Sequence, residues 1–341
     1  MLYFLNDYSE GAFPEILEKL GQTNMTHQLG YGEDEYCLCA KRKIKSALKN
    51  EKAEIFFISG GTQTNKVVIS ALLKPYEGVI AAHSSHIATH EAGAIENSGH
   101  KVIELPEKDG KLSADDVERC FKDFYADQNL EHMVFPGMVY ISQPTEYGTL
   151  YSAAELERIY ATCKKYNAPL YIDGARLIYG LGAKASDVTL ENICSLCDVF
   201  YIGGTKAGAL CGEAVVFTHQ NAPAHFFTHI KQQGALLAKG RLLGIQFDAL
   251  FTDRLYEKAA KNALKTAEII RNGFRQKGYE LVHENPTNQI FIKMKDSDIE
   301  RFSKHAVFGM WEKGENGTSV VRFVTSFATE KQDAEALVEL I

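Results

Sequence analysis

The sequence predicts an α/β protein built on one large, mostly parallel sheet, followed by a smaller α+β unit. Two observations support this class. Short runs of β-branched and aromatic residues alternate with amphipathic helical segments up to Phe217, which is typical of βαβ units. Beyond Phe217 the pattern changes to long helices and then to a group of strands, which indicates the second unit.

Seven short apolar runs are the predicted strands of the large sheet. Each is bounded by turn-forming or polar residues, as expected for buried strands. They cover residues 55–58, 78–82, 101–105, 138–142, 169–172, 198–202 and 214–217.

Helical segments between these runs supply the crossovers that parallel strands require. We expect helices over residues 64–73 and 91–98, after the first two strands. Two later helices carry clear start signals. Ser113 is placed to cap "SADDVERCFKDFY", and Ser152 caps "SAAELERIYATCKKY" with Glu155 at capping-box spacing.

The last part of the chain predicts the smaller unit. A helical region over roughly residues 224–275, with breaks, leads into "YELVHENPTNQIFIKM" and "GMWEKGENGTSVVRFVTSF", which are typical of antiparallel strands. A helix over residues 330–341 closes the chain. We place the boundary inside a helix, giving a large domain of residues 1–245 and a small domain of residues 246–341.

Composition and charge exclude some classes of function. A formal charge of −7 over 341 residues argues against nucleic acid or an anionic membrane as the main partner. The beginning, "MLYFLNDYSEG", has no basic leader, and no apolar stretch reaches membrane-spanning length. We therefore expect a cytoplasmic protein that acts on a small molecule.

Cysteine usage agrees with a reducing compartment. Seven cysteines are an odd number in a long chain, which favours reduced thiols over a disulfide framework. Cys194 and Cys197 have the spacing of a metal-binding pair, but no second Cys/His pair follows at suitable spacing. We expect buried thiols and no metal site.

The first candidate site follows the first predicted strand. In "FFISGGTQTNKVV" a strand, Ser59-Gly60-Gly61-Thr62 and a helix follow each other. Backbone N–H groups at such a helix start can hold a phosphate, although a plain tight turn gives the same pattern. The P-loop and GxGxxG patterns are both absent.

The second candidate is Asp173 in "APLYIDGARLIYG". It ends an apolar strand, and Arg176 follows three residues later. An aspartate here can be a helix cap with its ion pair. It can equally be a buried carboxylate that pairs with a cationic ring nitrogen, as pyridoxal phosphate requires.

The third candidate is Lys206 in "DVFYIGGTKAGALCGEAVVF". A glycine-flanked lysine between two apolar runs is either part of a surface turn or a nucleophile whose amine forms a Schiff base with a carbonyl. Gly203, Gly204 and Gly208 would let a flat cofactor approach the backbone. Phosphate cradle, carboxylate and lysine, in this order, together favour one cofactor, pyridoxal 5'-phosphate.

Three histidines form the fourth candidate. His83, His86 and His90 occur in "HSSHIATHEAGA", after the second predicted strand. They could be surface or capping residues, they could bind a metal, or one ring could stack on a flat cofactor. Only His86 and His90 have helical i, i+4 spacing.

Together these segments resemble the threonine aldolase family. The motifs "LNDYSEG", "GYGEDEY", "SGGTQTN", "SSHIATHEAGA", "IDGARL", "GGTKAG" and "VVRFVT" occur in that family's order and spacing over nearly the entire chain. The family consists of pyridoxal-phosphate enzymes of fold type I, related to aromatic amino acid β-eliminating lyases. The resemblance therefore implies the pyridoxal-phosphate-dependent transferase-like fold, with the cofactor in the large domain.

The resemblance also implies roles for individual residues. Lys206 would form the Schiff base and Asp173 would face the pyridine nitrogen. Gly61 and Thr62 would hold the phosphate, and His86 would stack on the ring and relay a proton.

For the substrate, the resemblance implies a carboxylate clamp. Arg176, which also borders the cofactor, and Arg322 would bind the carboxylate of an amino acid, for which bidentate guanidinium contacts are suited. Asn6 stands where the family more often has serine, in the N-terminal segment that contributes to the substrate site.

Some segments depart from the common family pattern. The lysine context "YIGGTKAGALCG", the segment "SQPTEYG" at 142–148 and "KQQGALLAKGRLLGIQ" at 231–246 are more similar to the phenylserine aldolase branch. Lys231, Lys239 and Arg241 would reach a phosphate or a neighbouring subunit, or else form a solvated basic face.

The implied reaction is retro-aldol cleavage of an L-β-hydroxy-α-amino acid, such as L-threonine, L-allo-threonine or phenylserine, to glycine and an aldehyde. His86, or a water that His86 or His83 positions, would take the hydroxyl proton. Two alternatives stay open: a β-eliminating lyase that releases ammonia and a keto acid, and a cofactor-free binding protein on the same fold. The resemblance also implies a homodimer or homotetramer.

Overall fold

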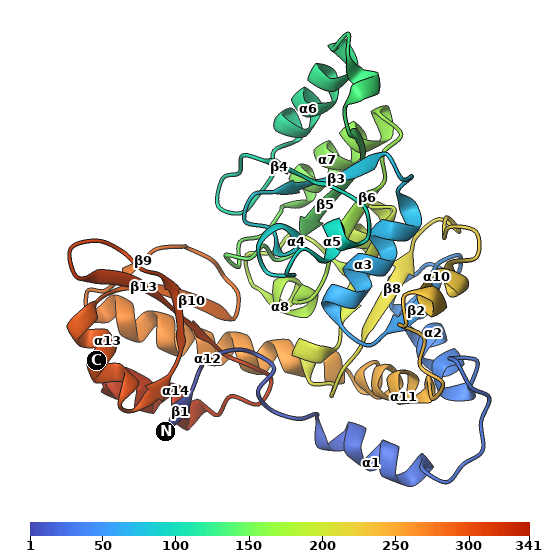
Figure 1. Cartoon of the computed structure of the whole chain (residues 1–341). Helices are drawn as coiled ribbons and strands as arrows, with labels where there is room; N and C mark the ends of the chain where they lie inside the picture. Colours follow the sequence, from blue (N-terminus) through green and yellow to red (C-terminus); the bar gives the residue numbers. More distant parts are fainter.

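A seven-stranded sheet forms the centre of the larger of two lobes in this computed structural model, which describes residues 1–341 (Figure 1). The strand order is β2-β8-β7-β6-β5-β3-β4, and only β8 runs against the others. The bounds are β2 (Glu54–Ile58), β3 (Glu77–Ala82), β4 (Val102–Leu105), β5 (Phe135–Ser142), β6 (Leu170–Asp173), β7 (Val199–Gly203) and β8 (Glu213–Phe217). All seven predicted strands are confirmed.

Side chains alternate between the two faces of this sheet, as the strand period requires. Ile172 and Phe200 belong to one core, whereas their neighbours Tyr171 and Val199 belong to the other. The large lobe is therefore a three-layer α/β/α arrangement with helices on both faces.

Four helices pack on the face that carries Tyr171, and they include the helix that starts at Gly61. They are α3 (Gly61–Leu72), α4 (His86–Thr89), α5 (Ala94–Asn97) and α10 (Phe226–Gln232). The helix expected over residues 91–98 is confirmed only in its central part, as α5. Ala92 and Gly93 both have positive φ, at 50° and 68°, so the helix begins only at Ala94.

Helices on the other face bury the larger core. They are α1 (Pro14–Thr23), α2 (Glu35–Leu48), α6 (Ala114–Ala126), α7 (Ala153–Lys165), α8 (Leu177–Gly182), α9 (Leu190–Ser195) and α11 (Arg241–Leu250). The expected caps are confirmed: Ser113 accepts from the N–H of Asp116, and Ser152 forms a capping box with Glu155. Short 3₁₀ turns are η1 (Leu130–His132) and η2 (Thr205–Ala207).

The smaller lobe is an antiparallel sheet covered by helices, as the sequence predicts. Its strand order is β12-β13-β10-β9, and a separate pair joins β1 to β11 in parallel. The bounds are β1 (Leu2–Tyr3), β9 (Glu280–Leu281), β10 (Gln289–Lys295), β11 (Ala306–Val307), β12 (Gly309–Glu312), β13 (Thr318–Val324), α13 (Asp296–Ser303) and α14 (Lys331–Glu339). Both termini lie on this lobe (Figure 1).

One long helix, α12 (Leu255–Gln276), connects the two cores and extends from the smaller lobe to the larger one in Figure 1. Ala260 and Ala263 pack into the large core, whereas Ala267 and Ile270 pack into the small one. The domain boundary placed after residue 245 stays a prediction.

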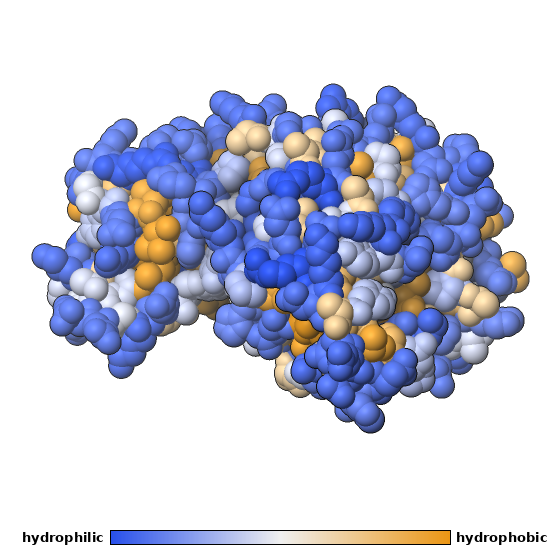
Figure 2. All heavy atoms as spheres, turned by 90° about the horizontal axis from the view of Figure 1, so that it is seen from above, coloured by the Kyte–Doolittle hydropathy of each residue, from blue (hydrophilic) through white to orange (hydrophobic).

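The surface is mostly hydrophilic, with a stripe of apolar atoms at the end that holds the smaller lobe (Figure 2). Nine of the sixteen exposed large apolar residues fall within the first 38 positions, including Met25 and Leu29. None of the helices is both long enough and apolar enough to span a bilayer.

Candidate active site

The candidate residues gather at the carboxyl edge of the sheet, where open α/β sheets bind ligands. Asp173 ends β6, and Lys206 follows β7, the next strand. Ser142 at the end of β5 lies beside Asp173 in the strand register. Gly61 begins the helix after β2, and His86 begins the short helix after β3.

Asp173 is buried, and its carboxylate accepts four hydrogen bonds. The hydroxyls of Tyr140 and Tyr201 each donate at 2.6 Å, the side chain of Asn65 donates at 3.1 Å, and the N–H of Ala175 donates at 2.9 Å. Burial raises the pKa of Asp173, but the positive charge of His86 and these donors outweigh it and hold the pKa below its ordinary value. The carboxylate therefore stays ionised.

A buried network extends from Asp173 to His86. Asn65 also donates to Glu91 at 2.7 Å and accepts from the hydroxyl of Tyr171 at 2.7 Å. Glu91 in turn contacts Nδ1 of His86 at 2.7 Å. Burial lowers the pKa of His86, but the Glu91 hydrogen bond and nearby carboxylates outweigh it and raise the pKa above its ordinary value.

Lys206 has an amine without a fixed partner. The side chain is half-buried, and Nζ forms no hydrogen bond or ion pair. It lies 6.0 Å from the centre of the Tyr8 ring. Burial, together with the positive charge of Arg176, lowers the pKa of Lys206 despite the nearby Asp7, Glu146 and Asp173 carboxylates. A lowered pKa suits a lysine that acts as a nucleophile.

The glycines around Lys206 allow other parts of the chain to pack closely against this turn. A Cβ on Gly203 would lie 2.3 Å from the carbonyl oxygen of Ala175, and one on Gly204 would lie 2.6 Å from that of Gly212. Gly208 has φ +92° and lies against Phe13. The expected role of these glycines in admitting a cofactor is therefore corrected to close packing of the turn.

Glu213 on β8 holds the turn that carries Lys206. Its carboxyl group accepts from the N–H of Gly204 at 3.0 Å and from the hydroxyl of Thr205 at 2.8 Å. Burial raises the pKa of Glu213 to about 8 despite these hydrogen bonds.

The first turn of α3 is a candidate anion site. Its first N–H groups, at Gly61 and Thr62, have no carbonyl partner within the helix, and Thr62 is exposed. The N-terminal end of this 12-residue helix favours negative charge.

Arg176 is committed to a partner that the sequence analysis missed. The buried Asp7 accepts from Nε of Arg176 at 2.7 Å and from Nη2 at 3.0 Å, and Asn288 donates to it at 2.9 Å. Asn6, the residue before Asp7, accepts from the N–H of Tyr8 at 2.9 Å through its carboxamide oxygen. The NH₂ group of the Asn6 side chain has no partner. The signal for Asp7 was its place beside Asn6 in "LNDYSEG".

Arg322 on β13 reaches the site from the smaller lobe. Its Nη1 donates to Gln289 at 3.1 Å, and its guanidinium lies over Trp311, with 5.0 Å from Cζ to the ring centre. Its Nε is buried and has no hydrogen-bond partner. Burial and the charge of Arg176 lower the pKa of Arg322.

The other two histidines occupy different positions. His83 is exposed and contacts Glu104 at 2.5 Å, so it lies away from the network. His90 lies between His86 and Trp311, with ring centres 5.9 and 6.3 Å apart respectively. Trp311 was not singled out by the sequence analysis.

The basic residues of 231–246 contact the N-terminal segment of the same chain. Arg241 donates to the carbonyl of Thr26 at 2.5 Å, and Lys231 lies over the Tyr31 ring at 4.7 Å. Lys239 is exposed. None of the three approaches Lys206 through a recorded contact.

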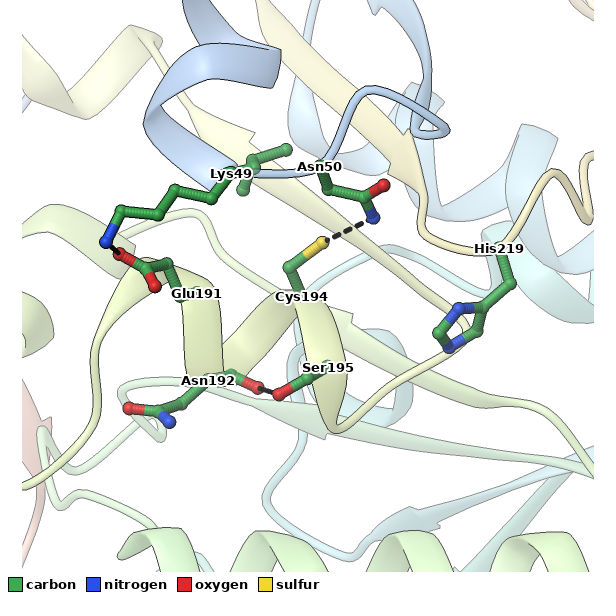
Figure 3. A pocket seen from close by; sticks show the side chains of 8 residues that line it. Lys49, Asn50, Glu191, Asn192, Cys194, Ser195 and His219 are labelled. Carbon is green, nitrogen blue, oxygen red and sulfur yellow. Dashed lines mark hydrogen bonds and ion pairs between the residues drawn. The ribbon is translucent and has the colours of Figure 1, made fainter.

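A separate surface hollow of about 390 Å³ lies between α2 and α9 (Figure 3). Asn50 donates to the sulfur of Cys194 at 3.2 Å, and Lys49 pairs with Glu191 at 2.7 Å. Burial raises the pKa of the Cys194 thiol, so it is a poor nucleophile. All seven cysteines are free, and Cys197 is buried.

The residues at the sheet edge fit pyridoxal 5'-phosphate. An unpaired amine, an ionised buried carboxylate and a free helix start match its aldehyde, ring nitrogen and phosphate. Two buried hydroxyls, of Thr64 and Ser85, have no partner, and they lie on the segments that carry Gly61 and His86. Such unpaired groups are costly unless a ligand meets them.

Comparisons with known proteins agree with this fit. Residues 4–297 match the model of the beta-eliminating lyase family. The chain is similar to a solved threonine aldolase of Leishmania major, with 42% identity, a TM-score of 0.97 and coverage of 100% of this chain and 98% of that chain.

Two further relatives extend the comparison. A low specificity L-threonine aldolase of a Pseudomonas species is 28% identical and is matched over 96% of this chain and 93% of its own length. Cystalysin of Treponema denticola, solved with pyridoxal 5'-phosphate, shares the fold at 17% identity with a TM-score of 0.72, over 100% and 89% of the two chains.

Proposed function

The chain belongs to the beta-eliminating lyase family and, within it, to the threonine aldolases, and from this premise we propose that it cleaves β-hydroxy-α-amino acids to glycine and an aldehyde. L-threonine and L-allo-threonine are the first expected substrates, with phenylserine as a further one. The β-eliminating alternative is not favoured, because the relatives matched along nearly the whole chain are threonine aldolases.

One observation carries the proposal. The Lys206 amine is unpaired, whereas the neighbouring Asp173 carboxylate is held by hydrogen bonds. An amine with a lowered pKa beside a buried carboxylate is the arrangement that pyridoxal 5'-phosphate needs. The cofactor-free alternative leaves this unpaired amine without a use.

When bound, pyridoxal 5'-phosphate supplies an aldehyde for attachment of the amino group and a ring that accepts the electron pair of the breaking bond. Lys206 would hold the aldehyde until the substrate amine displaces it. Asp173 would keep a proton on the ring nitrogen, and its four donors keep it ionised. Gly61 and Thr62 would hold the phosphate at the start of α3.

His86 is suited to stack on the cofactor ring. Glu91 fixes Nδ1 of the imidazole, which orients the ring and raises its pKa. His83, exposed and paired with Glu104, is not placed to relay a proton.

For the substrate carboxylate, the free Nε of Arg322 is the strongest contact that the site offers. Asp7 occupies Nε and Nη2 of Arg176, which leaves Nη1 for the cofactor or the substrate. Asn6 would add its free carboxamide NH₂.

The test combines colour and product analysis. Protein loaded with pyridoxal 5'-phosphate should absorb in the visible, borohydride should bleach the band, and the label should map to the Lys206 peptide. Glycine and aldehyde should form from L-threonine, L-allo-threonine or L-phenylserine. Lys206→Ala should lose both band and cleavage, and Lys184→Ala, at an exposed position, should keep both. Ammonia and pyruvate from serine in place of these products would contradict the proposal.

We also propose a homodimer, or a tetramer built from dimers, in the cytoplasm. The nine exposed apolar residues within the first 38 positions support a subunit contact there. Seven free cysteines support a reducing compartment. Sedimentation as a stable monomer with full activity would contradict the oligomer.

A further inference from the structure

Five carboxylic acids lie in the site around Lys206 and His86, and four of them are held by hydrogen bonds. Asp173 accepts four hydrogen bonds, and Asp7 accepts three. Glu91 accepts from Asn65 and contacts His86, and Glu213 holds the backbone turn of the lysine. A carboxylate committed in this way is not free to take a proton from a substrate.

Glu146 is the exception. Its carboxylate has one long contact, from the hydroxyl of Ser142 at 3.4 Å. Its charge favours the protonated forms of four surrounding cations: His86, Arg176, Lys206 and Arg322. It forms an ion pair with none of them, since His86 pairs with Glu91 and Arg176 pairs with Asp7. No direct ion pair therefore holds this carboxylate, although its charge acts on all four cations.

The backbone of Glu146, in contrast, is firmly held. Gln289 donates to the carbonyl of Glu146 at 3.3 Å and accepts from Arg322 at 3.1 Å, so one buried amide joins the two residues. The next residue, Tyr147, stacks on His283 with ring centres 4.2 Å apart. The side chain is therefore presented from a fixed position beside the guanidinium expected to bind the substrate carboxylate.

The position of the β-hydroxyl follows from the substrate's own bonds. The amine is to be attached where Lys206 now ends, and the carboxylate is to lie at Arg322. The hydroxyl-bearing carbon is bonded to the same Cα as these two groups, so the hydroxyl must lie in the space they border. The charge of Glu146 acts on both Lys206 and Arg322, the two residues that border this space.

The other candidate base is less suited. Nδ1 of His86 is held by Glu91, which leaves only Nε2 to take a proton. Stacking on the ring would also direct its face, and not a nitrogen lone pair, toward the ligand.

Resting on the proposed function, we propose that Glu146 is the general base that takes the β-hydroxyl proton of the substrate. The carboxylate receives the proton, and the O–H electron pair becomes the second C–O bond of the aldehyde. The Cα–Cβ bond breaks, and its electron pair stays with the glycine half, whose Cα then takes a proton from water. Glu146 releases its proton to water, so the balance needs no further reactant.

The experiment compares cleavage with a reaction that needs no hydroxyl. Glycine binds through the same amine and carboxylate contacts, and exchange of its α-hydrogen in D₂O, followed by NMR, does not involve a β-hydroxyl. Glu146→Gln should lower kcat for cleavage of all three β-hydroxy amino acids by about 10²-fold or more, the usual range for a general base. Glycine exchange should stay within about threefold of wild type.

Two readouts do not depend on turnover. The Kd of glycine, from the visible absorbance change, and the thermal unfolding midpoint of Glu146→Gln should both match wild type. Glu157→Gln, the same change at an exposed position on α7, is the matched control and should leave every readout unchanged. Formate added to Glu146→Ala should restore part of the cleavage rate.

The outcomes separate the two hypotheses. If wild type cleaves and Glu146→Gln cleaves within threefold of it, the assignment of Glu146 is wrong. Equal loss of cleavage and glycine exchange would also overturn it, since Glu146 would then act on binding or folding. A wild-type protein that exchanges glycine but cleaves none of the three substrates would overturn the proposed function, and this assignment with it.

Discussion

The two sides of the site differ in how fully their polar groups are paired. On the side formed by β5, β6, β7 and α3, Asp173 accepts four hydrogen bonds from buried or backbone donors. On the side that faces the smaller lobe, Nε of Arg322 has no partner and Glu146 has a single contact at 3.4 Å. Asp173 is held before any ligand binds, whereas Arg322 and Glu146 gain further partners only when one binds. The difference indicates a permanent cofactor on one side and an exchanging substrate on the other.

The largest effect on activity is expected on the side of the site that carries Asp173. Asp173→Asn keeps the size of the side chain but removes the charge that the ring nitrogen requires, so kcat should fall by about 10²- to 10³-fold. Steady-state kinetics of the cofactor-loaded protein measure this. Asp198→Asn is the matched control, because Asp198 is buried at the other end of the same strands and binds the N–H of Leu170. Equal losses in the two variants would show that Asp173 acts only on folding.

Substitutions on the side that carries Arg322 and Glu146 should change the affinity for the substrate. Arg322→Lys keeps the charge but loses the bidentate geometry, so the KM for the amino acid should rise about 10- to 100-fold, equivalent to one or two charged hydrogen bonds. The Kd of the cofactor should stay unchanged. Arg301→Lys, an exposed arginine on α13, is the control. A loss of cofactor affinity in Arg322→Lys would remove the distinction between the two sides.

The buried Asp7–Arg176 pair should contribute to the stability of the fold, and this contribution should depend on pH. Burial raises the pKa of Asp7, but the charge and hydrogen bonds of Arg176 outweigh it and bring the pKa below the ordinary value of 3.8. A lowered folded pKa stabilises the protein above the unfolded value, and this stability is lost as pH falls through the folded value. Asp7→Asn should lower the free energy of unfolding at neutral pH by about 3 kcal/mol, because it leaves a buried guanidinium unpaired.

Denaturant unfolding at a series of pH values measures this difference. Below pH 3.8 the wild type and Asp7→Asn should converge as the carboxylate takes up its proton. A gap between the two that stays constant down to the most acidic conditions would show that the charge of Asp7 does not stabilise the fold.

The smallest effect on stability and activity is expected from the exposed His83, which lies outside the site. His83 and Glu104 form an exposed pair, so His83→Gln should change stability by less than about 1 kcal/mol and cleavage by less than about twofold. His86→Gln should lower both the cofactor affinity and kcat, since it breaks the contact to Glu91. Parallel assays of the two variants would show whether His86, which contacts Glu91, contributes to cofactor affinity and kcat while His83 does not.

Local signals account for what the sequence could predict. The seven strands were identified because each is a short apolar run, and buried strands have this signature. Asp173, Lys206, His86 and Gly61 were identified because parallel strands bring their carboxyl ends to one edge. Each prediction required only a strand and the residues that follow it.

Long-range contacts explain what the sequence missed. Asp7 meets Arg176, and Gln289 meets Glu146, across separations of 169 and 143 residues that no local pattern reveals. The helix expected over residues 91–98 forms only over Ala94–Asn97, because Ala92 adopts a positive φ, which a non-glycine residue does not signal. The unusual segment "SQPTEYG" was the one available signal for Glu146.

The pairing of β1 with β11 determines when this site can exist during synthesis. Leu2 pairs with Ala306, and the carbonyl of Phe4 accepts from the N–H of Val324, so the first residues made must wait for almost the last. Asp7 follows directly after them and reaches Arg176 from there. The lysine edge of the sheet can fold while translation continues, but the complete pocket forms only once the ribosome has released the smaller lobe. Cofactor capture is therefore expected to be a post-translational event in the life of this chain.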